Sequence, residues 1–340
     1  MARRVTVPSV FGVAIVAVLA FASLLGFGTV NSFAQRLSFS IATGPGSGTY
    51  FPVGETIAGI ISHPPGVARC LNPAACGPEG LIASAQTSPG AYGNVVSVEN
   101  GRADSALAQY DVIAQAIAGK GAFKKKQVHV RVIGALFPEQ VHLVVSTRSH
   151  ILSLAKLRGK RISLGAINSG TAVTARAVMA AYRVRAKTSS DSPDVAALKL
   201  QTGKLDAFFF VGGAPVPLVD TLIESGEATL LPIDGEGRDR LLAHEQGLSA
   251  DTIPSGTYGR LPTVNTVSVR ALWIVSDRVP NETVFGITRA LFAPSNRTLL
   301  VQGSPAARAI SLRRAAQDLP APLHPGAEKF YREVRRLNTP

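Results

Sequence analysis

The sequence predicts an α/β fold of two doubly wound lobes that are joined by a hinge of two strands. Strand-like and helix-like patterns alternate from residue 37 onward, which is typical of largely parallel sheets covered by helices. Two long strand-like stretches, 128–146 and 263–276, bracket an α/β pattern that reads as a self-contained unit. Two connecting strands of this kind permit two lobes to close on a ligand held between them.

Apolar periodicity predicts each element in chain order. The expected strands are 37–42, 80–85, 103–107, 128–135, 141–146, 161–165, 205–211, 228–233 and 264–275. The expected helices are 49–62, 93–100, 109–119, 153–158, 171–182, 193–202, 214–225, 236–246, 280–294 and 324–337. Gly134 and residues 137–139 are expected to break the stretch 128–146 into two strands. This order predicts lobe 1 at 35–143 plus 270–340 and lobe 2 at 144–269.

The N-terminus has the pattern of a secretory signal peptide. Arg3 and Arg4 precede an apolar run over 10–27, and Ser32-Phe33-Ala34 offers small residues for cleavage before Gln35. We therefore predict a signal peptide at 1–34 and a periplasmic location. Because the apolar run approaches the length that spans a bilayer, an uncleaved membrane anchor remains the alternative.

Composition narrows the class of partner. Lys and Arg number 35 against 22 Asp and Glu, for a net charge of +13. Such a charge favours acidic ligands, an anionic membrane surface or simple solubility. Nucleic acid is not expected, because the chain carries an export signal and lacks clusters that mix basic and aromatic residues. Cys70 and Cys76, the two cysteines of the chain, are predicted to form a structural disulfide in an oxidising compartment.

A glycine-rich corner lies between the first predicted strand and the first predicted helix. Residues 43–50 read TGPGSGTY, and bare backbone amides at such a helix start favour an anion. A Walker A loop would need lysine after Gly48, where Thr49 stands. A dinucleotide fingerprint would need glycine at Thr49 and an acidic residue about 20 residues on, and neither is present. The alternative is a loop that only turns the chain.

A second corner of the same chemistry precedes the helix at 171–182. Ser169, Gly170 and Thr171 follow a predicted strand, so hydroxyls and amides gather again at a helix N-terminus. On residue type alone this corner is equally consistent with an ordinary helix cap. Ligands of doubly wound sheets bind beyond the carboxyl ends of the strands, where both corners lie. Together the two corners are expected to hold a small carboxylate from two sides.

The motifs resemble the TAXI family, the extracytoplasmic solute receptors of TRAP transporters. The resemblance rests on an ordered set of segments: Ile41–Gly54, Val141–Val145, Leu157–Arg176, Gly203–Gly213 and Ile253–Tyr258. It implies a type II periplasmic-binding-protein fold. It also implies capture of glutamate, glutamine or a related carboxylate for a fused TRAP membrane subunit, of the kind with 4 plus 12 spans. The sequence departs from the family pattern at Pro45, Ser47 and Asn168, where glycine is common.

The candidate ligand-binding residues follow from these motifs by position. Hydroxyls and amides are expected to bind the carboxylate, and two aromatic side chains are expected to cover its aliphatic part. From the two corners and the strand at 205–211 the candidates are Thr43, Gly44, Ser47, Gly48, Thr49, Tyr50, Ser169, Gly170, Thr171, Phe210, Gly212 and Gly213. Gln109, Ser88 and Asn94 are candidates of second rank.

An exported enzyme is the rival class. The six histidines lack the HExxH spacing of a zinc site, and no G-x-S-x-G nucleophile elbow occurs. Asp206 has no carboxylate partner nearby in the sequence for acid–base catalysis. We therefore expect a monomeric receptor without enzymatic activity, cofactor or metal. An exported sensor without a transport role is the second alternative, because both need the same hinge.

Overall fold

Ten strands form one mixed sheet in the part of the chain that the structure describes. The structure is a computed structural model, and it describes residues 36–65, 70, 72–124 and 128–337. The predicted signal peptide at 1–34 lies outside the described residues. The strands are β1 (Leu37–Ala42), β2 (Leu81–Gln86), β3 (Ser105–Gln109), β4 (Arg131–Ser146), β5 (Arg161–Ser163), β6 (Lys187–Ser189), β7 (Ala207–Gly212), β8 (Ala228–Leu230), β9 (Leu248–Ile253) and β10 (Val264–Val275).

Helices follow most of the parallel strands. They are α2 (Tyr50–Ile61), α3 (Ala91–Glu99), α4 (Tyr110–Ile117), α5 (Gly170–Ala181), α6 (Pro193–Gln201), α7 (Pro217–Glu224), α8 (Gly235–His244), α9 (Asn281–Leu291), α10 (Arg297–Gly303), α11 (Leu312–Ala315) and α12 (Pro325–Leu337). The sequence did not predict β6, β9, α10 or α11, which are short or polar elements. The helix expected at 153–158 is a single 3₁₀ turn, Leu154–Leu157.

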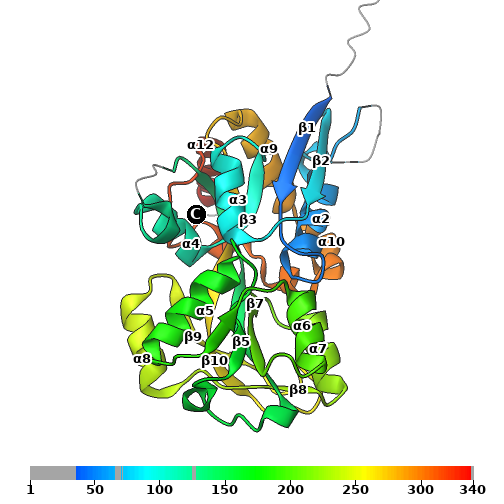
Figure 1. Ribbon diagram of the computed structural model, residues 1–340. Helices are drawn as coiled ribbons and strands as arrows, with labels where there is room; N and C mark the ends of the chain where they lie inside the picture. The colour runs from blue at the N-terminus through cyan, green and yellow to red at the C-terminus, as the bar shows by residue number, and fades with distance from the viewer. Residues whose placement is uncertain (1–35, 66–69, 71, 125–127, 338–340) are drawn as a thin grey trace, which may run out of the picture. The chain divides into compact units, whose positions relative to one another are not determined.

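The order of strands along the sheet is β2-β1-β3-β10-β4-β7-β5-β6, with β8 beside β4 and β9 beside β10. Strand β1 is parallel to β2 and β3, and β5 is parallel to β6 and β7. Strands β4 and β10 are antiparallel to their neighbours and run between these two parallel groups (Figure 1). The predicted α/β fold of two lobes joined by two long strands is therefore confirmed.

The stretch 131–146 is one continuous strand, so the predicted break at 137–139 is wrong. Its first part pairs with β10, and its pairing with β7 begins only at Gln140. Pro138 has no N–H to donate, but it precedes the β7 ladder and leaves no bond to β7 unmade. The register with β10 shifts within this stretch instead: Leu136 and Phe137 lie between the pairs Arg270–Pro138 and Leu272–Ala135, opposite the single residue Ala271. The strand thus passes from one lobe to the other without interruption.

Separate apolar cores fill the two lobes. One cluster gathers buried residues from β1, β3, the C-terminal part of β10 and the helices around them, including α12. In the other lobe alternate residues of β4 and β7 enter different clusters. Leu143 and Phe209 pack toward α5 and α8, and Val144 and Phe208 pack toward α6 and α7. This alternation is the mark of a sheet buried on both faces. The exact lobe bounds stay a prediction.

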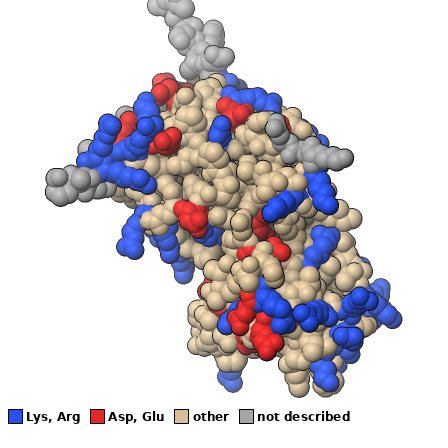
Figure 2. Space-filling view, turned by 90° about the vertical axis from the view of Figure 1, so that its left-hand side faces the viewer, with Lys and Arg blue, Asp and Glu red and all other residues tan. Residues whose placement is uncertain are grey.

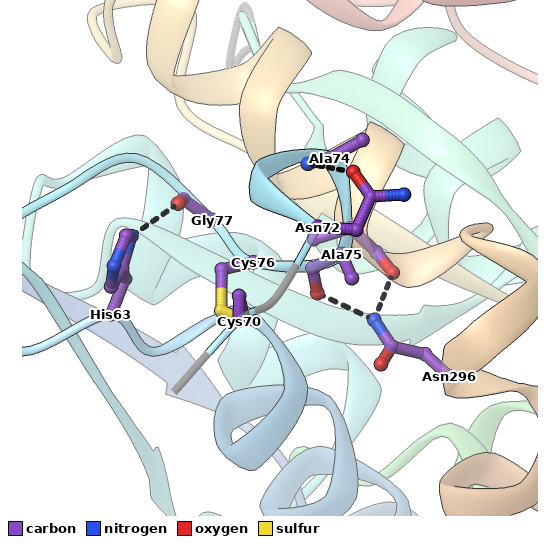
Figure 3. The surroundings of a disulfide bond; sticks show 9 residues. His63, Cys70, Asn72, Ala74, Ala75, Cys76, Gly77 and Asn296 are labelled. Carbon is purple, nitrogen blue, oxygen red and sulfur yellow. Dashed lines mark hydrogen bonds between the residues drawn. A yellow bond between two sulfur atoms is a disulfide. The ribbon is translucent and has the colours of Figure 1, made fainter. Parts of the chain in front are cut away.

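The predicted disulfide between Cys70 and Cys76 is present, with the Cα atoms 6.1 Å apart (Figure 3). Beside it the Asn296 side-chain amide donates to the Ala75 carbonyl at 2.7 Å and to the Ala290 carbonyl at 2.8 Å. The loop between α2 and β2 is therefore tied to the end of α9. This position, away from the cavity described below, agrees with a structural role.

The surface charge is mixed. On the face in Figure 2, Lys and Arg side chains are spread over both lobes, with smaller groups of Asp and Glu between them. On that face the positive charge does not form one patch. Among the described helices, none has both the length and the apolar character needed to cross a bilayer.

Candidate functional site

A cavity of about 60 Å³ lies where the carboxyl ends of the parallel strands of both lobes meet. Its walls include the starts of five helices, α2 to α6, and strands β4 and β7. The lining residues are Gly44, Pro45, Gly48, Thr49, Tyr50, Pro89, Gly90, Ala91, Gln109, Glu139, Gly165, Ala166, Ser169, Gly170, Thr171, Asp191, Pro193, Ala196, Phe209, Phe210 and Val211.

The first corner contributes the start of α2. The Gly48 amide donates to the Pro45 carbonyl at 2.9 Å, which closes a tight turn before the helix. Thr49 is the N-cap, yet its side chain makes no capping hydrogen bond. Its hydroxyl lies over Gly212, where a Cβ would come within 2.6 Å of the Thr49 Oγ1. Thr49 therefore keeps a hydroxyl at the cavity wall.

The second corner contributes the start of α5. The Ser169 hydroxyl accepts from the Ala172 amide at 3.1 Å and donates to the Ala166 carbonyl at 2.7 Å. The Thr171 hydroxyl accepts from the Val211 amide at 3.2 Å. Both hydroxyls therefore have a local structural role, and the helix-cap alternative holds for Ser169. Both residues still line the cavity, where the first N–H groups of α5 favour a negative charge.

Gln109 joins the two lobes at the cavity wall. It is the N-cap of α4 and only 2% exposed. Its side chain lies against Gly170, since a Cβ on Gly170 would overlap the Gln109 Oε1 atom. That oxygen is buried and has no hydrogen-bond partner among the described residues. A second-rank candidate from the sequence thus lies in the centre of the site.

Two buried acids flank the cavity. The Tyr50 hydroxyl donates to the Glu139 Oε2 at 2.7 Å, and burial raises the pKa of Glu139 well above its usual range. The Asp111 carboxylate accepts from the Thr174 hydroxyl at 2.9 Å, across the seam between α4 and α5. Burial raises the pKa of Asp111 to about 6. Glu139 lines the cavity, whereas Asp111 lies behind it.

A third acid, Asp191, is already neutralised. It forms an ion pair with Lys199 of α6 and accepts from the Ser189 hydroxyl at 2.6 Å. The backbone N–H of Asp191 also donates a hydrogen bond to the Ser163 hydroxyl. Together these contacts fix the loop that precedes α6. Despite its burial, the hydrogen bonds lower the pKa of Asp191. Its charge is therefore satisfied within the protein.

Several predicted site residues lie outside this cavity lining. Thr43 is fully buried, and its hydroxyl donates to the Gln86 carbonyl at 2.7 Å, so it has no surface to offer a ligand. Ser88 donates to Asn94 at 2.6 Å, and the Asn94 amide donates to the Thr43 and Leu107 carbonyls. These three side chains tie the loops after β1 and β2 to α3 and β3. They position the cavity from behind.

Ser47, Gly212 and Gly213 also lie outside the lining. The Ser47 hydroxyl donates to Asp194 of α6 at 2.8 Å, which links the first corner to the other lobe. Ser47 and Gly213 line an adjoining hollow near Pro215 and Pro305. Gly212 is covered by Thr49, as described above. The remaining predicted residues, which line the cavity, are Gly44, Gly48, Thr49, Tyr50, Gln109, Ser169, Gly170, Thr171 and Phe210.

The sequence did not identify Glu139 or Asp191 as site residues. Glu139 lies inside a segment that was expected to be a loop between strands, and Asp191 lies in a polar stretch without a motif. Only the pairing of β4 between β10 and β7 brings Glu139 to the cavity. The one available signal was an acidic residue within an otherwise apolar run.

The histidine near the second lobe's core has a structural role. His142 is fully buried, and its ring nitrogens contact the Gln140 carbonyl at 2.9 Å and the Tyr258 hydroxyl at 2.7 Å. Burial lowers the pKa of His142 to about 4, so the ring is neutral at physiological pH. Among the described residues, no group of three or more His, Cys, Asp or Glu is placed to hold a metal.

The fold and the cavity together define a class of protein. A small cavity enclosed between two α/β lobes, which two long strands connect, is the arrangement of a periplasmic solute-binding protein. The chain belongs to the NMT1-like family, whose model matches residues 41–334.

Solved structures share the fold at low sequence identity. MatC from Rhodopseudomonas palustris with bound malate matches at 12% identity and a TM-score of 0.52, over 88% of this chain and 97% of that one. A protein from Bordetella bronchiseptica RB50 matches at 13% identity and a TM-score of 0.52, over 89% of this chain and 99% of that one. A structure described as a periplasmic transporter matches at 11% identity and a TM-score of 0.52, over 88% of this chain and 93% of that one. At these identities the likeness concerns the fold.

Proposed function

We propose that this protein is an exported receptor that captures a small carboxylate in the cavity between its lobes. The observation that carries the proposal is the cavity wall: five helix starts converge on it, and no Lys, Arg or His is among its described lining residues. Backbone N–H groups and helix dipoles therefore supply the positive potential for an anion. The malate bound in MatC is a small carboxylate of the same kind.

A thermal-shift panel tests this proposal. Malate, succinate, glutamate and 2-oxoglutarate are compared with their fully esterified methyl esters, which have no free carboxylate. A bound ligand at a hundredfold excess over its Kd raises the free energy of unfolding by about 2.7 kcal/mol. We expect at least one free carboxylate to raise the melting temperature and its ester to leave it unchanged. If every acid behaves like its ester, the protein does not bind a carboxylate.

We further propose that the receptor delivers its ligand to a TRAP-type membrane subunit. We also propose that the lobes are divided at 143/144 and 269/270. Support for the partner comes from the ordered TAXI-like segments of the sequence. Support for the second boundary comes from the apolar cores, which separate between Val269 and Ala271, whereas along β4 they separate between Phe137 and Val141, just before the proposed first boundary. Uptake of the labelled ligand into vesicles that contain a TRAP-type permease is expected to require the receptor. Uptake that proceeds equally without it contradicts the transport role.

Thr49→Val is expected to weaken binding of the identified carboxylate by about 1–3 kcal/mol, because it removes a hydroxyl from the wall without removing a cap bond. Calorimetric titration measures the change, and the fold should be unaffected. Thr202→Val, at an exposed position that does not line the cavity, is the matched control and should bind like the wild type. Equal affinities of Thr49→Val and the wild type would exclude the first corner from the binding site.

Ser169→Ala is expected to lower both affinity and stability. The variant loses the N-cap bond to the Ala172 amide, which costs about 1 kcal/mol of unfolding free energy. Frayed amides at the start of α5 then bind the anion less well. Urea denaturation and titration of the same sample separate the two losses. A variant that loses stability but keeps full affinity would show that Ser169 acts as a cap alone.

A further inference from the structure

The side chains of the cavity wall are rich in hydrogen-bond acceptors and carry no free cation. Asp191 is paired with Lys199, so its charge is offset. Glu139 has no such partner, because its one side-chain hydrogen bond comes from the neutral Tyr50 hydroxyl. That bond occupies Oε2, and Oε1 has no donor among the described residues. The wall therefore offers Glu139 no positive charge.

The groups around Glu139 come from several elements. Tyr50 on α2 and Asp111 on α4 are the titratable groups that act on its charge. On β10 it is paired with Val269, and the neighbouring Arg270 is committed to the Gln317 and Asp318 carbonyls. His142, further along β4, is neutral and bonded elsewhere. None of these groups neutralises an ionised Glu139.

A second, independent observation is the buried oxygen of Gln109. This residue is 2% exposed and lines the same cavity, yet its Oε1 has no partner. A ligand carboxylate adds only further acceptors to this wall. Like charges held close together in a desolvated site are not both ionised. Glu139 and a ligand carboxylate at this wall are therefore not both ionised.

We infer that Glu139 is protonated at neutral pH and meets the ligand carboxylate as a hydrogen-bond donor through Oε1. It is thus the residue by which the cavity distinguishes a plain carboxylate from a ligand that carries a cation. The proton comes from solvent and stays on Glu139 while the carboxylate is bound. The ligand part of this inference rests on the proposed function. Burial above all, together with the negative Asp111, raises the pKa of Glu139, whereas the Tyr50 bond acts in the opposite direction.

Infrared difference spectroscopy tests the proton directly and needs no ligand. The full chain and its Glu139→Gln variant are compared at about pH 7.5, where an ordinary glutamate is ionised. We expect the variant to lose a protonated carboxyl band that the wild type shows. Loss of only an ionised carboxylate band would overturn the inference. The exposed Glu55→Gln on α2 is the matched control and should leave the protonated carboxyl band unchanged.

Titration with the carboxylate that binds best in the panel tests the donor role. The wild type is expected to lose affinity at least tenfold as the pH rises from about 7 through the range in which Glu139 ionises. Glu139→Gln keeps an N–H donor and should change by less than threefold over that range, while Glu55→Gln follows the wild type. A loss of thirtyfold or more in Glu139→Gln at about pH 7 would show that an ionised Glu139 pairs with a cationic ligand. If no carboxylate binds, the proposed function fails, and the infrared result still decides the state of Glu139.

Discussion

Gly170→Ala is expected to reduce ligand affinity by at least thirtyfold and to destabilise the fold. A Cβ at this position would overlap the Gln109 Oε1 and lie 3.0 Å from the Ala91 Cβ. Gln109 is almost fully buried, so its side chain can only move into the cavity, which holds about 60 Å³. Overpacking of this kind costs about 1–3 kcal/mol. The better helix propensity of alanine offsets only about 1 kcal/mol of that cost.

The matched control is Gly59→Ala on α2. This glycine is also helical, but it is exposed and a Cβ there would meet nothing within 4 Å. The substitution is expected to raise the free energy of unfolding by about 0.5–1 kcal/mol and to leave affinity unchanged. Calorimetric titration and urea denaturation measure both quantities. If Gly170→Ala binds the carboxylate as tightly as the wild type, the ligand does not occupy this cavity.

The two glycine corners were predictable because their signals are local. Gly48-Thr49-Tyr50 and Ser169-Gly170-Thr171 each follow a strand and start a helix, and that order places bare amides at the edge of a parallel sheet. Even within these corners, the direction of each side chain was not predictable. Thr43 points into the protein and Ser47 reaches across to Asp194. Such choices depend on neighbours that are distant in the sequence.

Long-range pairing determined what the sequence did not reveal. Glu139 reaches the cavity because β4 continues through Pro138, pairing with β10 up to Gln140 and with β7 from Gln140 onward. The proline and the nearby glycine suggested a loop. The strands that pair with this segment are more than 60 residues away along the chain, so the local sequence could not reveal them. The register shifts of β4 against β10 fall beside this glycine and this proline, so the pattern marked an irregularity within a strand and not its end. Sequence patterns predicted the helices and strands better than they predicted which residues line the cavity.

Asn168 takes a backbone conformation that favours glycine. It stands before Ser169 and has a φ of 66°, in the left-handed region that glycine and asparagine tolerate best. Its carbonyl accepts from the Gly93 amide at 3.0 Å, which joins the loop before α5 to α3. The loop before α5 therefore keeps this conformation without a glycine at position 168.

Asp111→Asn is expected to remove a large pH dependence of stability. Asp111 is 4% exposed, and burial raises the pKa of its carboxyl to about 6 in the folded state, against about 3.9 unfolded. Because the folded pKa is the higher one, the stability that Asp111 contributes is present below about pH 4 and is lost as the pH rises through about 6. The shift of about two units corresponds to about 3 kcal/mol.

Urea denaturation of the wild type and of Asp111→Asn, at about pH 4 and about pH 7.5, measures this difference. Relative to the variant, the wild type should be about 3 kcal/mol less stable at the higher pH than at the lower one. The comparison between chains cancels the contributions of the other acids, and the amide can still bond to Thr174 after its hydroxyl rotates. Asp239→Asn, an exposed acid on α8, is the control and should follow the wild type at both pH values. If Asp111→Asn also follows the wild type, the seam between α4 and α5 admits enough water to solvate the Asp111 charge, and the two lobes are less tightly closed there than their contacts indicate.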